Sequence, residues 1–195
     1  ERVTVRSRAL GPTFTRMSNN RTYRGYHDLC VEVNSELFAE QTGLRDTQLT
    51  RLYGDADGDR NGRLSWSEVQ RFQNDLWRRY EYQANEVAYS PTMFLSAGGG
   101  DCEDWAIVTA LLFTFWGHRA YVASIESDSG HHAVALVPEE ELGGGPGTIE
   151  YAGGSYSGTY IPIDYDHVGS FSPAIEGAWH VRTIWVPQRI FGWAL

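Results

Sequence analysis

Residues 98–117 read GGGDCEDWAIVTALLFTFWG, in which three glycines and an acidic turn precede an uncharged apolar stretch. Because that stretch is apolar on every side, it predicts a helix that is buried at the centre of the fold. Its uncharged part, 105–117, is shorter than the roughly 20 residues that a bilayer span requires. The sequence therefore predicts a central core helix that begins near Cys102, and no transmembrane segment.

The segments on either side of this helix differ in period. Over 65–82 apolar residues recur every three or four positions, which predicts an amphipathic helix, and the weakly patterned stretch 1–50 predicts one or two more. A loop rich in Ser, Pro and Gly is expected between the 65–82 helix and the core helix. Downstream, small and β-branched apolar residues predict strands at 119–126, 132–137, 159–164 and 179–186. Helices followed by antiparallel-type strands indicate an α+β fold.

The composition of the 195 residues excludes several classes of protein. With 42% apolar and 13% aromatic residues, the chain is globular rather than disordered. Its formal charge of −9 repels phosphate backbones, so no nucleic-acid partner is expected. Every basic residue is Arg, which excludes a lysine Schiff base or a lysine general base. The two cysteines are too few for a disulfide framework.

The stretch 57–68 reads DGDRNGRLSWSE and has the pattern of an EF-hand calcium loop. Such a loop provides oxygen ligands from positions 1, 3, 5, 7, 9 and 12, with Gly at position 6 for a sharp turn. These positions are filled, in order, by Asp57, Asp59, Asn61, the carbonyl of Arg63, Ser65 through water and a bidentate Glu68, with Gly62 at the turn. A register that starts at Asp55 places Arg60 where Gly is required. The sequence therefore predicts Ca²⁺ as a cofactor.

A second interpretation of 57–68 needs no metal. Ser65 followed by Glu68 also has the pattern of a capping box at the start of the 65–82 helix. If calcium binds, two features favour a structural or weak site. Arg60 and Arg63 add positive charge to the loop, and the sequence contains no second EF-hand to pair with it.

The glycine run places Cys102 where a reactive thiol can form. Glycines allow a substrate to approach the backbone closely, and in the first turn of a helix the unpaired N–H groups and the dipole favour a thiolate. The neighbouring carboxylates of Asp101, Glu103 and Asp104 oppose that negative charge. Activation of the thiol therefore requires a histidine partner.

A base and an acid follow Cys102 in the order of a catalytic triad. His131 and His132 stand at the start of a predicted strand, and Asp164 ends another. In this order, and above all in the motif Gly-Asp-Cys-Glu-Asp-x-Ala at the start of the core helix, the chain resembles the transglutaminase-like cysteine peptidase superfamily. It more closely resembles the microbial transglutaminase-like cysteine proteinase branch, and the resemblance covers about 88–170.

The resemblance implies a papain- or transglutaminase-like core over 88–195, in which the helix that bears the cysteine packs on an antiparallel sheet. A helical segment with a single EF-hand, 1–87, would precede this core. The resemblance also implies Cys102 as the nucleophile, His132 as the base and Asp164 as the acid that orients the imidazole.

Two of these roles have alternatives in the sequence. Only one of two adjacent strand residues can face the helix, and the family pattern of His followed by small apolar residues matches His132 rather than His131. Asp164 ends the apolar strand, whereas Asp166 lies beyond it. Cys30 has neither a glycine loop nor a helix start beside it and is expected to be a small packing residue.

The expected function is a calcium-binding cysteine hydrolase that acts on peptide or amide bonds of a protein or peptide substrate. Two alternatives stay open: acyl transfer by the same residues, as in a transglutaminase, and a catalytically silent, calcium-stabilised binding module. The chain begins at Glu1 rather than Met, which favours an extracytoplasmic protein from which a signal, an anchor or a larger precursor has been removed.

Overall fold

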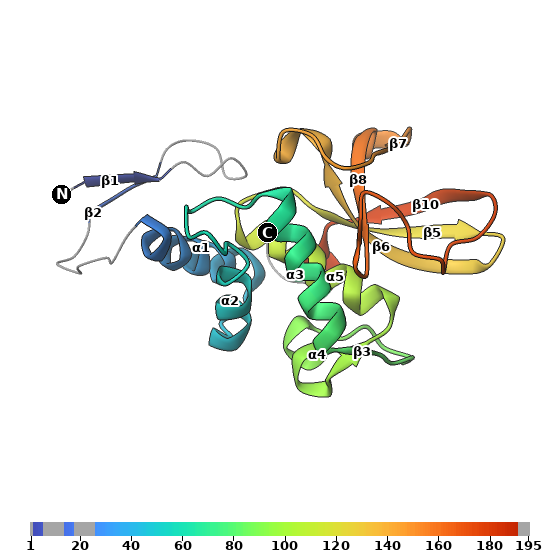
Figure 1. The fold of residues 1–195 in the computed structure, drawn as a ribbon, viewed down its shortest axis with the longest axis horizontal. Coiled ribbons are helices and arrows are strands. Elements are labelled where there is room, and N and C mark those ends of the chain that lie inside the picture. The colour runs from blue at the N-terminus through green and yellow to red at the C-terminus, as the bar shows by residue number, and fades with distance from the viewer. Residues whose placement is uncertain (1, 6–13, 18–25, 191–195) are drawn as a thin grey trace.

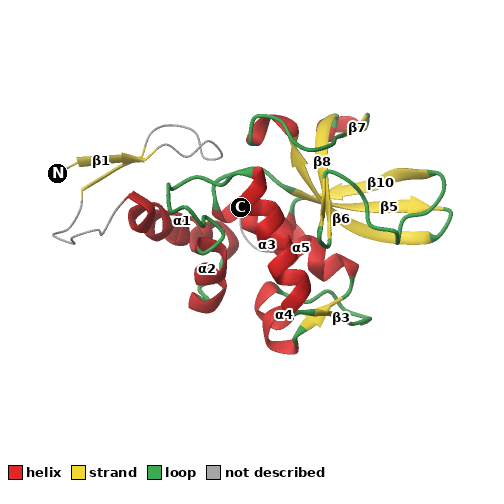
Figure 2. Cartoon of the chain, in the orientation of Figure 1, coloured by secondary structure: helices red, strands yellow, loops and turns green. Residues whose placement is uncertain are grey.

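The structure, a computed structural model, describes residues 2–5, 14–17 and 26–190 of the chain. Helices gather on one side and a curled antiparallel sheet on the other, with α5 (Cys102–Phe115) between them (Figures 1 and 2). Glu1, on which the expectation of processing rests, lies outside the described residues. Among the described residues, no helix has both the length and the apolar character that crossing a membrane requires.

Helix α5 forms the middle of the hydrophobic core, as its uninterrupted apolar sequence predicts. Val108, Leu111 and Leu112 have no exposed surface. The Tyr53 hydroxyl donates a hydrogen bond to the carbonyl of Val108 at 2.8 Å, and Trp116 Nε1 donates to the carbonyl of Tyr53 at 2.9 Å. Apolar packing and buried polar contacts therefore both fix α5 to the helices that precede it.

The sheet beside α5 runs in the order β10-β5-β6-β8-β7, with β9 paired to β8, and each of its named strand pairs is antiparallel. Its strands are β5 (Tyr121–Ser127), β6 (Gly130–Pro138), β7 (Ile149–Tyr151), β8 (Gly158–Asp164), β9 (His167–Val168) and β10 (Trp179–Trp185). The four expected strands are present with ends shifted by at most two residues. α5 packs against β6 and β5 through buried apolar side chains such as Val122 and Ala135. This arrangement confirms the expected α+β fold class.

The helices expected before the core are α1 (Tyr26–Thr42), α2 (Thr47–Gly54) and α3 (Trp66–Arg79). The N-terminal segment also contains two strands that the sequence analysis did not predict, β1 (Arg2–Val5) and β2 (Phe14–Met17), which form an antiparallel pair. These strands contain β-branched Val and Thr residues, which favour strands, but each is too short to establish a period in the sequence.

The loop expected between α3 and α5 contains a further helix, α4 (Pro91–Ala97). Its ends carry standard helix signals: the Ser90 hydroxyl accepts a hydrogen bond from the amide of Met93 at 3.3 Å, and Gly98 ends the helix at φ +83°. Proline at the first helical position is also favourable. Outside this region, short elements complete the described fold, namely η1 (Glu139–Glu141), η2 (Gly154–Tyr156) and α6 (Pro187–Ile190).

A short parallel strand pair fixes the backbone immediately before Cys102. β3 (Glu81–Tyr82) pairs with β4 (Gly99–Gly100), so that the chain after α3 runs beside the glycine run. Gly99 has φ +146°, and a Cβ at this position would overlap the carbonyl oxygen of Glu81. Glycine is therefore required at position 99 by the close approach of two backbones.

Candidate active site and candidate calcium site

Cys102 is the first residue of α5, as the glycine run and acidic turn predict, and it is half-buried. The helix start is organised by Asp104, whose carboxylate has no exposed surface. This carboxylate accepts hydrogen bonds from the amide of Asp101 at 3.0 Å, from Asn85 Nδ2 at 2.7 Å and from the amide of Tyr89 at 2.5 Å. Asp104 therefore ties the loop that contains Asn85 and Tyr89 to the start of α5.

The acidic residues beside Cys102 disfavour additional negative charge, as the sequence predicts. Burial raises the pKa of Asp101, and the nearby carboxylate of Asp104 raises it further. Burial likewise raises the pKa of Glu103, with added repulsion from Asp101 and Asp104. A thiolate at Cys102 therefore needs a cation close to it.

His132 is the candidate for that cation. Its side chain is buried, and its Nε2 lies 2.8 Å from Oδ1 of Asp164, the last residue of β8. The second oxygen of Asp164, Oδ2, accepts a hydrogen bond from the amide of Ser172 at 2.8 Å. Burial alone would lower the pKa of His132, but hydrogen bonds to Asp164 and Cys102 and the charges of those two groups raise it to about 9. The structure thus brings Cys102, His132 and Asp164 together.

The alternative residues lie differently. His131 is exposed on β6, whereas the adjacent His132 is buried and bound to Asp164. The carboxylate of Asp166 lies 2.9 Å from Nδ1 of His167. With Nε2 of His132 bound to Asp164, Nδ1 is the ring nitrogen left for Cys102. The geometry therefore favours His132 and Asp164 over their neighbours as partners of the thiol.

A cavity of about 530 Å³ opens beside the Cys102 thiol. Its walls come from α5, from strands β5, β6 and β10 and from the segment before α4, and they are mainly apolar. The lining residues are Ala88, Cys102, Glu103, Ile107, Val122, Ser124, His131, His132, Ala133 and Trp185. Cys30, by contrast, is only 3% exposed within the core, as expected of a packing residue.

Tyr165 is a part of the site that sequence analysis missed. It follows Asp164 directly, and its ring centroid lies 5.4 Å from that of His132. Its φ of +54° is uncommon for a residue with a side chain. Burial raises the pKa of the phenol, and the nearby Cys102 and Asp164 raise it further, so Tyr165 is neutral beside the imidazole. No local sequence signal marks a tyrosine that adopts this conformation.

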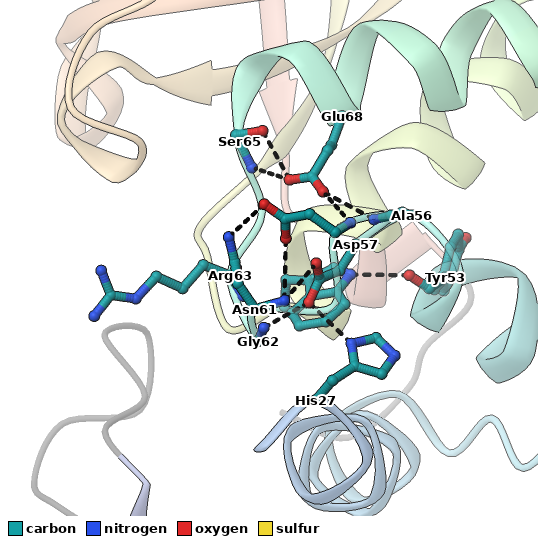
Figure 3. A network of polar contacts seen from close by, with 12 residues as sticks. His27, Tyr53, Ala56, Asp57, Asn61, Gly62, Arg63, Ser65 and Glu68 are labelled. Atoms are coloured by element: carbon teal, nitrogen blue, oxygen red, sulfur yellow. Dashed lines mark hydrogen bonds and ion pairs between the residues drawn. The ribbon is translucent and has the colours of Figure 1, made fainter. Parts of the chain in front are cut away.

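Three of the predicted calcium ligands converge in the loop between α2 and α3. Figure 3 shows two of them, Asp57 and Glu68, within the network of hydrogen bonds that surrounds this loop. Carboxylate oxygens of Asp57, Asp59 and Glu68 lie within 4.8 Å of one another. Ca²⁺ binds oxygens at about 2.3–2.6 Å, so oxygens on opposite sides of one ion are separated by up to about 5 Å. Asp57 is only 1% exposed, and in the described part of the chain no Arg side chain forms an ion pair with these carboxylates. The donor set therefore fits a calcium ion.

Hydrogen bonds within the loop hold the other predicted positions. Asn61 Nδ2 donates to Oδ2 of Asp59 at 2.8 Å, and Asn61 Oδ1 accepts from the amide of Arg63 at 2.8 Å. The amides of Asn61 and Gly62 donate to the two oxygens of Asp57 at 3.2 and 2.7 Å. The backbone is thus folded around the oxygens with glycine at the sharp turn, where Gly62 has φ +80°.

Glu68 takes part both in the predicted calcium loop and in the predicted capping box. Its Oε2 accepts a hydrogen bond from the amide of Ser65 at 3.0 Å, which is one half of the capping box of α3; the Ser65 oxygen accepts from the Glu68 amide in the other half. The Ser65 hydroxyl also donates to Oε2 at 2.7 Å. Glu68 Oε1 accepts from the amide of Gly58 at 2.8 Å, within the loop. Burial would raise the pKa of Glu68, but these hydrogen bonds and one from Asp59 hold it below its usual value. Glu68 is therefore a carboxylate at the point where the loop becomes a helix.

His27 is a second residue that sequence analysis missed. It lies on α1, and its Nδ1 is 3.0 Å from Oδ2 of Asp57. The contact joins α1 to the loop across 30 positions of sequence, and no local pattern can reveal a contact of that separation.

Comparison with known proteins finds similar structures but no similar sequences. No protein-family model matches the chain, and no curated protein matches its sequence. Calcium-bound LapG from Legionella pneumophila is similar at 16% identity and a TM-score of 0.47, over 80% of this chain and 87% of that one. The EGTA-treated form of LapG is similar at 14% identity and a TM-score of 0.45, over 80% and 84%. A candidate cysteine protease from Cytophaga hutchinsonii is similar at 12% identity and a TM-score of 0.39, over 79% and 49%.

Proposed function

We propose that this chain is a cysteine hydrolase that cleaves peptide or amide bonds, with Cys102 as nucleophile, His132 as general base and acid, and Asp164 as the acid that orients His132. The observation that carries the proposal is the position of His132. It is bound to Asp164 on one side and to Cys102 on the other, at the wall of a cavity beside the thiol.

In the proposed reaction, the Cys102 thiolate attacks the substrate carbonyl carbon, and the carbonyl π electrons move to oxygen. The amide of Cys102, in the first turn of α5, lacks an acceptor within the helix and is a suitable donor to that oxyanion. The C–N bond then breaks, and the amine leaves with the proton of the His132 imidazolium. His132 next removes a proton from water, whose oxygen attacks the thioester. Release of the carboxylic acid restores the thiolate and the imidazolium.

The raised pKa of His132 suits this sequence of proton transfers. An imidazole with a pKa of about 9 is protonated at neutral pH, so it stabilises the thiolate and holds the proton that the amine needs. Asp164 supplies the negative charge that keeps the proton on the ring.

The proposal is tested by alkylating Cys102 with iodoacetate and with iodoacetamide between about pH 6 and about pH 10. The imidazolium of His132 attracts the anionic reagent but not the neutral one, so the ratio of the two rates reports the charge on His132. We expect this ratio to fall as the pH rises through about 9, because His132 then loses its proton. Peptide mass mapping separates Cys102 from buried Cys30. A flat ratio, or a Cys102 no more reactive than a thiol of the unfolded chain, contradicts the proposal.

We further propose that 57–68 binds one Ca²⁺ through the side chains of Asp57, Asp59, Asn61 and Glu68 and the carbonyl of Arg63. The proposal is supported by the clustered carboxylate oxygens, of which those of Asp57 and Glu68 belong to buried residues, and by the lack of Arg ion pairs to them in the described part of the chain. When bound, the ion supplies positive charge that links the loop to the start of α3.

Removal of calcium is expected to lower the melting temperature. An ion that binds only the folded state stabilises it by about 2.7 kcal/mol at a hundredfold excess over the dissociation constant. Glu68→Gln is expected to lower the response to calcium, because an amide is a weaker calcium ligand than a carboxylate, although glutamine is compatible with the capping box. Thermal melts with calcium and with a chelator measure both effects.

The control for Glu68→Gln is Glu150→Gln, on an exposed position of β7, which should respond to calcium as the unmodified protein does. A melting temperature indifferent to millimolar calcium, with no ion bound in calorimetry, would reduce 57–68 to a capped acidic turn.

A further inference from the structure

The turn that carries Asp164 is held by α3, the helix that begins at the calcium loop. Gln70 Nε2 donates a hydrogen bond to the backbone carbonyl of Asp166 at 2.7 Å, across 96 positions of sequence. The same Nε2 donates to Asn74 Oδ1, one turn further along α3, at 3.0 Å. Both N–H groups of the amide are therefore used, which fixes its orientation. Gln70 clamps the loop between β8 and β9 two residues beyond Asp164.

A second contact lies seven residues further along α3, two helical turns away. The Trp77 ring centroid is 5.0 Å from that of Tyr165, and Trp77 also contacts Trp105 of α5 at 5.3 Å. Tyr165 in turn lies against the His132 ring. A series of tilted ring contacts thus runs from Trp77 of α3 through Tyr165 to the imidazole.

The turn needs support from outside because its backbone is strained. Tyr165 adopts φ +54°, a conformation that is unfavourable for L-residues with side chains and that they retain only where surrounding contacts impose it. Gln70 and Trp77 contact the turn directly at Asp166 and Tyr165. When such contacts are removed, a strained turn relaxes toward a more common conformation, and the residue before it moves as well.

We propose that Gln70 is a positioning residue for the proposed reaction: by holding the carbonyl of Asp166, it keeps Asp164 within hydrogen-bonding distance of His132. This inference rests on the proposed function, because it acts through the Asp164 and His132 pair. Asp164 is also held by the pairing of its backbone with His167 of β9 and by the amide of Ser172, which donates to Oδ2. Neither contact is made to Oδ1, the oxygen that faces His132.

The charge on His132 gives a readout that loss of packing alone does not move. The groups that act on its proton are Asp164 from β8 and Cys102 from α5, while Tyr165 from the turn is neutral. If Asp164 moves out of hydrogen-bonding distance, the imidazolium loses its main stabilising partner, and the pKa of His132 falls. The iodoacetate to iodoacetamide ratio should then begin to fall at lower pH.

The test compares Gln70→Ala with Gln73→Ala in the presence of saturating calcium. Gln73 is the matched control: it lies on the same helix, is fully buried, and donates to Thr109 Oγ1 of α5 at 3.1 Å instead of to the turn. We expect Gln70→Ala to shift the midpoint of the alkylation ratio downward by about one pH unit, a tenfold change in the proton affinity of His132. Gln73→Ala should lower the melting temperature and leave the midpoint in place. Titration of the His132 ring by NMR measures the same shift directly.

The outcomes separate this inference from the proposed function. A flat ratio in the unmodified protein contradicts the proposed function itself. A midpoint near pH 9 in the unmodified protein that is unchanged in Gln70→Ala overturns the positioning role alone. Equal downward shifts in Gln70→Ala and Gln73→Ala also overturn it, because the effect would then follow from general loosening of α3.

Discussion

Cys102→Ala is expected to reduce the rate of thiol-dependent hydrolysis by a factor on the order of 10⁴ or more. In the proposed mechanism the thiolate forms the covalent bond to the substrate, and neither His132 nor the N–H groups of α5 can replace it. The substituted residue keeps a methyl group at a half-buried position, so the fold should be retained. The rate at which the protein hydrolyses a fluorogenic peptide library measures the loss of activity. Labelling with a thiol-directed active-site probe measures the loss of the reactive thiol.

Cys30→Ala is the control for this substitution. Cys30 lies in the core, 3% exposed, so its loss should lower stability slightly and leave hydrolysis in place. Hydrolysis that survives in Cys102→Ala would require a different nucleophile and would end the proposed mechanism.

His132→Ala is expected to reduce hydrolysis by about 10²–10⁴-fold, the range for loss of a general acid and base. Without the imidazolium, the thiolate loses the cation that offsets Asp101 and Glu103, and the leaving amine loses its proton donor. His180→Ala is a suitable control, because that side chain is 67% exposed and contacts only Glu126 among the partners described for it. If His131→Ala abolished activity and His132→Ala did not, the base would be the exposed histidine.

Asp164→Asn tests the third member of the proposed triad through the pH dependence of the alkylation ratio. A carboxylate stabilises the imidazolium of His132, whereas an amide carries no charge to do so. The pKa of His132 should therefore fall from about 9 toward its ordinary value of 6.5, and the alkylation ratio should decline at correspondingly lower pH. Hydrolysis should decrease less than in His132→Ala, because Asp164 orients the base without forming or breaking bonds.

The features that sequence analysis predicted are those with local signals. A uniformly apolar stretch after a capped acidic turn is sufficient to place Cys102 at the start of a buried helix, and small apolar residues after His132 are sufficient to place it on a strand. The helix α4 also had local signals, a Ser-Pro start and a Gly end, which were outweighed by the glycine-rich composition around it. Periodicity and capping therefore account for most of the element order.

The features that were missed arise from tertiary contacts. The Gln70 contact to the Asp166 carbonyl and the His27 contact to Asp57 join residues 96 and 30 positions apart, and Gln and His at those positions have no distinctive pattern. The positive φ of Tyr165 is imposed by its neighbours in space rather than by its own preference. Such contacts decide how accurately the site is assembled, and they can be read only from the folded chain.

The position of α3 also bears on how this protein could be engineered. One helix carries Glu68 at the candidate calcium loop, Gln73 against α5, and Gln70 and Trp77 against the turn of the candidate acid. A graft of residues 88–195 onto another scaffold would remove the contacts of Gln70 and Trp77 with the turn that follows Asp164. A graft of the loop alone would separate Glu68 from the helix that it caps. The two candidate sites are therefore not independent modules. A transplant that keeps either one intact must include α3.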